Sequence, residues 1–188
     1  IAASSVGGDL TLRTGNADDT SGITDTGTVT VGGNLSVTND VSNGDIVMET
    51  LAVAGTIALT TSGDGDATID NGTLDLDIAA SSVGGDLTLR TGNAGDASGI
   101  TDTATVTVGG NLSVTNDVDN GDIVMDTLAV TGSIALTTQA TGGNAAVTNA
   151  TVLDLAASTV GGTLGVTATS GDITDSGQLT ITGAATFT

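Results

Sequence analysis

Three aspartates lie close together in the segment GDGDATIDNG (63–72), where Asp64, Asp66 and Asp70 stand among glycines and other small residues. Carboxylate oxygens carried by a loop are the ligands that Ca²⁺ prefers. The segment therefore offers Asp64, Asp66 and Asp70 as candidate calcium ligands. An acidic loop that is simply solvated is the alternative interpretation. The residue types suggest no other metal and no cofactor.

A second acidic segment, NADDTSGITD (16–25), gathers Asp18, Asp19 and Asp25. A dedicated calcium site should recur in each copy of a repeat, but the counterpart of the first segment, ATGGNAAVTN (140–149), carries no acid. The GDGD run also departs from the tandem glycine-rich nonapeptide of calcium-binding β-rolls. Calcium is therefore kept as a candidate ligand of the first segment only.

Catalysis has few of its usual residues in this chain. Asp could supply the paired carboxylates of a glycoside hydrolase, but there is no His for proton transfer and no Trp or Tyr for a sugar cleft. A lyase would need a cationic base, and the only cations, Arg13 and Arg90, are equivalent positions of a repeat. We therefore expect that the protein is not an enzyme.

The charge balance is strongly acidic, with 22 Asp and Glu against two Arg and a net charge of −20. Nucleic acids and anionic membrane surfaces are bound through cationic side chains, so neither is an expected partner. No apolar run approaches a membrane span, and no signal peptide or Cys is present. The charge suits a salty, cation-rich medium, where cations screen the repulsion between the acids.

A long internal repeat organises the chain. Residues 1–61 and 78–138 differ at only seven positions. We divide the chain into repeats at 1–77 and 78–154 and a partial, diverged third repeat at 155–188, all within one domain, 1–188. Because Ile1 falls inside a repeat unit, we expect a segment of a longer protein with uncapped ends.

Inside each repeat a shorter pattern recurs, an apolar residue followed two places on by Gly and then by two apolar residues in alternation. It occurs eight times, as in VGGDLTL (6–12) and VGGNLSV (31–37), at spacings of 25, 22, 30, 25, 22, 30 and 21 residues. Its glycines are Gly8, Gly33, Gly55, Gly85, Gly110, Gly132, Gly162 and Gly183. We expect these eight glycines to stack as one ladder of turns, at which a positive φ favours glycine.

Alternation of apolar and small polar residues predicts short, half-buried strands, and no segment has a helical period. About three strands and three bends would close one coil of 21–30 residues, for example 35–37, 45–48 and 51–53. Stacked coils form a parallel β-helix, an all-β solenoid. A β-sandwich and a β-propeller are the alternatives. The predicted inward residues are Leu10, Leu12, Leu35, Val37, Ile57, Leu59, Leu87, Leu89, Leu112, Val114, Ile134, Leu136, Leu164 and Val166.

The phrase VGGNLSVT and the run GGTLGVTATSGDITDSGQLTITGAATFT (161–188) resemble the repeat regions of large bacterial exoproteins of the filamentous haemagglutinin type. The resemblance covers essentially the whole chain and implies a right-handed parallel β-helix that serves as the stalk of a secreted adhesin. It also implies an extracellular or cell-surface location. The amino-terminal secretion domain of that family and the Arg-Gly-Asp triplet of some adhesins are absent.

The repeat favours a structural function, a stalk or filament segment without catalysis. Expected partners are further repeats of the same chain or other copies, stacked end to end or laterally into a fibre, without insertion into a membrane. The alternative is a module that binds carbohydrate, a host surface or Ca²⁺. Ice binding is disfavoured, because Ala52 and Ala54 interrupt the threonine pairs such as Thr28 and Thr30.

Overall fold

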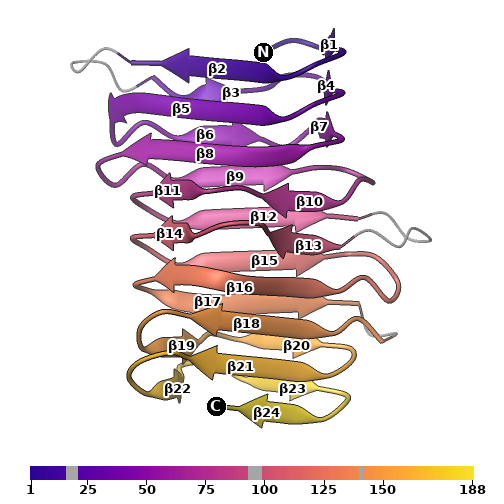
Figure 1. Cartoon of the computed structure of the whole chain (residues 1–188), viewed down its shortest axis with the longest axis vertical. Helices are drawn as coiled ribbons and strands as arrows, with labels where there is room; N and C mark the ends of the chain where they lie inside the picture. Colours follow the sequence, from indigo (N-terminus) through magenta and orange to yellow (C-terminus); the bar gives the residue numbers. More distant parts are fainter. Residues whose placement is uncertain (16–20, 93–98, 140–141) are drawn as a thin grey trace.

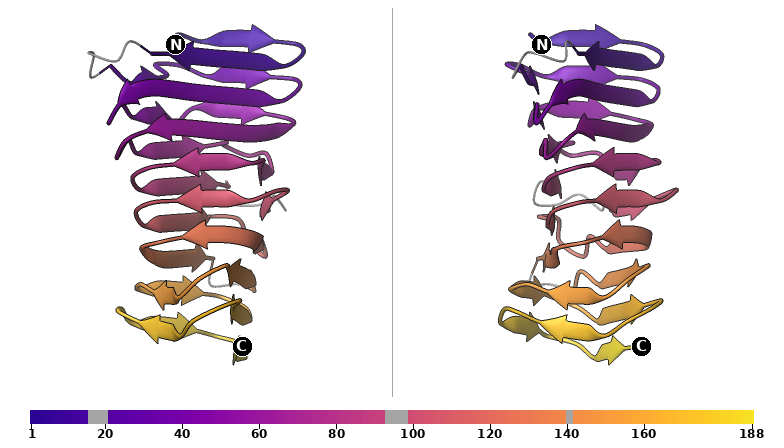
Figure 2. Two further views of the ribbon diagram at one scale, coloured as in Figure 1. Left: turned by 60° about the vertical axis from the view of Figure 1, so that its left-hand side comes forward. Right: turned by 90° about the vertical axis from the view of Figure 1, so that its left-hand side faces the viewer.

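The computed structural model describes residues 1–15, 21–92, 99–139 and 142–188, and every regular element in these ranges is a β-strand. The strands wind into a right-handed solenoid of about eight turns, stacked along the long axis of the molecule (Figure 1). Figure 2 shows the same stack from two other sides. Every strand pairing is parallel, which confirms the predicted fold class.

Three parallel sheets line the solenoid. The smallest contains β1 (Ser4–Val6), β4 (Val29–Val31) and β7 (Leu51–Val53). An 11-stranded sheet contains β2 (Leu10–Thr14), β5 (Leu35–Ser42), β8 (Thr56–Ser62), β10 (Leu76–Ile78), β11 (Ser81–Val83), β13 (Ile100–Asp102), β14 (Val106–Val108), β16 (Ile123–Val130), β18 (Ala145–Asn149), β21 (Leu164–Ala168) and β24 (Ala185–Phe187).

The third sheet has ten strands and lies behind the 11-stranded sheet in Figure 1. It contains β3 (Ile23–Thr24), β6 (Ile46–Met48), β9 (Ala67–Asp70), β12 (Leu87–Thr91), β15 (Leu112–Asn116), β17 (Ser133–Thr138), β19 (Leu153–Leu155), β20 (Ser158–Val160), β22 (Ile173–Asp175) and β23 (Leu179–Ile181).

The core is a set of aliphatic columns between these sheets. Alternate residues of each strand point inward, so that β5 and β12 read buried, partly exposed, buried along the chain. Leu35, Leu87 and Leu112 are at most 1% exposed. The predicted inward residues are all confirmed, with Leu10 and Leu12 of the first coil only partly buried. Without aromatic side chains, Val, Ile and Leu alone supply the apolar burial that stabilises the fold.

The eight glycines do not form one ladder, which corrects the prediction. The amide of Gly33 donates to the carbonyl of Gly8, and that of Gly55 donates to Gly33, each at 3.1 Å. Gly85, however, donates to Gly65 at 3.0 Å and not to Gly55. The glycines therefore fall into three separate ladders, which are Gly8–Gly33–Gly55, Gly85–Gly110–Gly132 and Gly162–Gly183.

The reason is that the interval from Gly55 to Gly85 is longer than one coil. The sequence separation between paired residues of neighbouring coils varies. It is smallest in pairs such as Ala145 with Leu164 and largest in pairs such as Leu10 with Leu35. Gly55 and Gly85 are farther apart in the sequence than either pair. The interval between them therefore contains one coil and a further part of the next.

The strand that follows each of these glycines shows the same offset. Leu87, two places after Gly85, pairs with Ala67 of β9 rather than with Ile57 of β8, which stands two places after Gly55. The two glycine corners consequently lie at different places on the coil, so they cannot stack on each other.

The predicted positive φ at these corners is also wrong, because none of the eight glycines has one. Close stacking on the preceding coil requires glycine instead at all of these corners except Gly8, which lies in the first coil. A Cβ atom on Gly55 would lie 2.6 Å from the carbonyl oxygen of Gly33, and one on Gly132 would lie 2.5 Å from that of Gly110. Positive φ occurs at other corners, for example at Gly63 and at Asn43.

Candidate functional site

A column of Asp and Asn side chains lines the corners beside the glycine ladders. Each side-chain oxygen accepts a hydrogen bond from the main-chain amide of the residue stacked on it in the next coil. Oδ1 of Asp45 accepts from Asp66 N at 2.9 Å, and Oδ1 of Asp66 accepts from Asp86 N at 2.7 Å. The column continues through Asn111, which accepts from Ser133 N at 2.9 Å. These side chains bind one coil to the next.

The calcium candidates are distributed over such contacts. Asp66 belongs to the corner column, and the amide of Asp64 donates to Oδ1 of Asn43 at 2.8 Å. Asp70 accepts from the Gly72 amide at 2.8 Å and lies 3.8 Å from the guanidinium of Arg90. Within the described part of the chain, no three acidic side chains are grouped closely enough to hold a metal ion. The structure therefore does not bring Asp64, Asp66 and Asp70 together as a ligand set.

The second acidic segment is only partly described, because Asp18 and Asp19 lie outside the described residues. Asp25 binds the next coil: its carboxylate accepts from the amides of Glu49 and Thr50, at 3.1 and 2.8 Å, and from the Thr50 hydroxyl at 2.7 Å. Asp102, its equivalent in the second repeat, accepts from Asp126 N, Thr127 N and Thr127 Oγ1 at 2.8, 2.9 and 2.7 Å.

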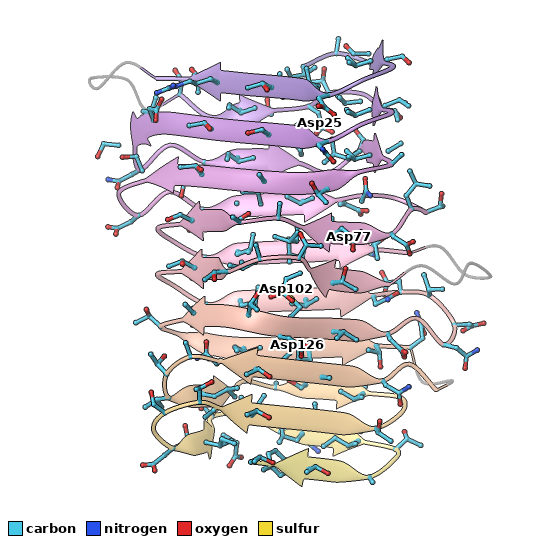
Figure 3. All side chains as sticks on the ribbon, viewed as in Figure 1. Asp25, Asp77, Asp102 and Asp126 are labelled. Atoms are coloured by element: carbon cyan, nitrogen blue, oxygen red, sulfur yellow. The ribbon has the colours of Figure 1, made fainter. Side chains whose placement is uncertain are left out.

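Figure 3 labels these carboxylates, with Asp25 nearest the amino-terminal end and Asp77, Asp102 and Asp126 following along the axis. Asp77 accepts from the hydroxyl of Thr101, so it too is engaged by the next coil. Asp25, Asp77 and Asp102 thus accept hydrogen bonds from the next coil, and Asp126 donates its main-chain amide to Asp102.

Both arginines join neighbouring strands. Nε of Arg13 lies 2.5 Å from Asp40. Arg90 lies between two coils, since it pairs with Asp70 of β9 on one side and with Asp117 on the other. Arg13 and Arg90 are largely exposed, so these pairs contribute little to stability. These ion pairs do engage the guanidinium groups that a lyase or an anion-binding site would use.

Buried polar side chains are the functional residues that sequence reasoning missed. Asn39, Asn71, Asn116 and Asn149 are fully buried, and all have hydrogen bonds to the main chain. The alternation itself could have found Asn39 and Asn116. In LSVTN the first and third residues point inward, so the fifth must as well.

Three hollows on the surface of the described residues are small. One of about 300 Å³ lies at the first coil, against Ile1, Leu12 and Ile23, and one of about 220 Å³ lies at the last, against Ile173 and Phe187. A groove of about 140 Å³ on the side of the solenoid is lined by threonines and Asp126. None resembles the deep, mostly apolar pocket that usually binds a small molecule.

Comparison with known proteins gives one partial match. The model of a family described as repeats of unknown function (DUF5649) matches residues 142–188. No curated protein and no solved structure matches the chain. The match agrees with the repetitive architecture and assigns no activity to any residue.

Proposed function

We propose that this chain is a segment of a rigid shaft, the stalk or filament of a secreted, cell-surface protein of the adhesin type, and that it has no catalytic activity. The single observation that carries the proposal is the continuity of the core. One cluster of buried aliphatic residues extends from Ile23 to Val166, and every coil in it is bonded to the next. The resemblance to haemagglutinin-type repeats supports the same function.

The chemistry of each repeat is devoted to stacking. Corner acids such as Asp25 and Asp102, both arginines, and the buried Asn71 and Asn149 contact neighbouring coils, so such contacts recur in the second repeat. A repeated unit that uses its polar groups to bind its neighbours adds length with each copy. A repeat makes about three and a half coils, so at about 4.8 Å per coil it adds about 17 Å to the shaft.

Charge and surface fit an extracellular setting. A net charge of −20 keeps shafts apart at low salt and is screened in a cation-rich medium. None of the described residues forms a helix that could cross a membrane. We infer that the partners are further repeats of the same protein or other copies of it, and that nucleic acid is not a partner.

The length of engineered arrays tests this function. Duplicating residues 1–77 within the chain should lengthen the particle by about 17 Å per added copy, as measured by small-angle scattering and electron microscopy. The thickness of the particle should stay constant. A particle that thickens instead of lengthening would show that repeats fold back on one another, and the shaft function would then be wrong.

A further inference from the structure

Equivalent strands of successive repeats lie on opposite sides of the solenoid. Leu10 of β2 pairs with Leu35 in the 11-stranded sheet, whereas Leu87 of β12, its equivalent in the second repeat, pairs with Leu112 in the ten-stranded sheet. Leu164 of β21 belongs to the 11-stranded sheet again. In Figure 1, β2 is in front, β12 behind and β21 in front.

A repeat therefore contains a half-integral number of turns. Leu10, Leu35, Ile57 and Ile78 succeed one another in register, so three full coils end at residue 78. Leu87 follows Ile78 by nine residues, which is enough chain to reach the other side but not to complete a coil. The long repeat thus makes three and a half turns.

The half turn is made at residues 71–81, where the smallest sheet stops. Asn71 stands where the strand after β7 would be. Its Oδ1 accepts from Val53 N at 2.8 Å, and its Nδ2 donates to Val53 O at 3.0 Å. The side-chain amide of Asn71 therefore takes the place of a strand paired with Val53. The main chain can then leave this side of the coil.

The long strand β8 is then covered by two short strands instead of one. β10 pairs with Thr56 and Ile57, and β11 pairs with Thr60. Between them the chain bulges away, and the hydroxyl of Ser81 accepts a hydrogen bond from Leu59 N at 3.0 Å. The hydroxyl supplies the acceptor that a continuous strand would have given, so this buried amide is not left unpaired.

The same junction recurs one repeat later. Asn149 accepts from Val130 N at 2.8 Å and donates to Val130 O at 3.0 Å. The long strand β17 is covered by β19 and β20. The hydroxyl of Ser158 accepts from Leu136 N at 3.0 Å. Two junctions with the same three contacts indicate a built element rather than an accident of loop length.

We propose that residues 71–81 and 149–158 are phase-setting elements, which rotate each long repeat by half a turn relative to the repeat before it. Along a shaft of such repeats, a given face of the repeat therefore alternates between opposite sides. The proposal deepens the shaft function and rests on it only for its use in longer arrays. A given face returns to the same side after two repeats, which is seven turns or about 34 Å.

Pairs of spin labels on the full chain test the alternation. Thr38 and Thr115 are equivalent outward positions of the two repeats, on β5 and β15. Thr38 and Thr107 belong to one column, three coils apart, and make the control pair. We expect a clearly longer distance between labels at Thr38→Cys and Thr115→Cys than between those at Thr38→Cys and Thr107→Cys. An equal or shorter distance would overturn the proposal.

Removing most of the element, together with Asp70, tests its causal role. Deletion of residues 70–79 leaves Ile57 and Leu87 as far apart in the sequence as Leu153 and Ile173, which pair between neighbouring coils. The shortened repeat should then have three whole turns, and the distance between labels at Thr38→Cys and Thr115→Cys should fall to that of the control pair. A folded deletion variant that keeps the long distance would contradict the proposal.

Loss of folding would also count against the proposal, since the remaining strands have the same partners as those of an uninterrupted native coil. Failure of the shaft function would look different. It would appear as arrays that do not lengthen, while the label distances within the 188-residue chain stayed as expected.

Discussion

The side-chain amide of Asn71 is bonded to both main-chain polar groups of Val53, at 2.8 Å to the nitrogen and 3.0 Å to the oxygen. A third bond, 2.6 Å long, joins its Nδ2 to the carbonyl of Asp75. Asn71 is fully buried, so water cannot replace these contacts. One side chain therefore terminates the smallest sheet and orders the start of the next segment.

Replacing Asn71 by Ala should destabilise the fold by about 2–4 kcal/mol, because each buried polar group that loses its partner costs about 1–3 kcal/mol. Denaturant unfolding measures the loss, with Thr30→Ala, on the outer surface of β4, as control. Hydrogen exchange gives a local check: the Val53 amide should exchange faster in the variant than in the wild type. Unaltered exchange at Val53 would contradict the role that we give to Asn71.

Ser81 and Ser82 provide a matched pair of neighbouring serines. Ser81 is 7% exposed and accepts from Leu59 N, while Ser82 is exposed on the other face of β11. Ser81→Ala should cost about 1–3 kcal/mol, because the Leu59 amide loses its acceptor in the core. Ser82→Ala should change stability by less than about 0.5 kcal/mol. Thermal unfolding of the two variants compares them, and equal losses would show that the buried hydroxyl is not needed.

The sequence was sufficient to predict the fold class and the residues that point inward. Alternation in segments such as LSVTN fixes which side chains point inward, and Leu35, Val37 and Leu112 lie where this pattern places them. The reason is physical: a strand has only two faces, and burial of the aliphatic face is the main stabilising term.

The phase between repeats could not be predicted in the same way. Nothing local in the sequence between Gly55 and Gly85 shows whether it forms one long coil or one and a half. That choice depends on hydrogen bonds between distant residues, Asn71 with Val53 and Ser81 with Leu59. For the same reason the acids near Asp66 suggested a metal site, whereas the partner of Asp66 is an amide of the next coil.

A comparison of Gly110 with Gly8 tests whether close stacking of the coils is what requires glycine at a corner. A Cβ atom on Gly110 would lie 2.8 Å from the carbonyl carbon of Gly85 and closer still to Oδ1 of Asp86, while one on Gly8 would have nothing within 4 Å. Gly110→Ala should destabilise the fold by about 1–3 kcal/mol, the usual cost of forced overpacking.

The control Gly8→Ala should be neutral to slightly stabilising, by up to about 1 kcal/mol, since φ is not positive there and alanine restricts the unfolded chain. Urea unfolding of both variants measures the difference. A neutral Gly110→Ala would mean that backbone contact does not determine the choice of glycine at this corner.

Asp66 tests whether the corner acids act through their oxygen or through their charge. Its Oδ1 accepts from Asp86 N at 2.7 Å, and Asn111 performs the same task for Ser133 in the same column. Asp66→Asn keeps the acceptor and removes one of several like charges stacked about 4.8 Å apart. It should therefore preserve stability in high salt and raise it by up to about 1 kcal/mol in low salt, where repulsion is least screened. Asp66→Ala removes the acceptor and should cost about 0.5–1.5 kcal/mol at either salt concentration.

Denaturant unfolding of the two variants in low and in high sodium chloride, with Ca²⁺ chelated, distinguishes the outcomes. Equal destabilisation by both substitutions would show that the negative charge, and not only the acceptor oxygen, is required.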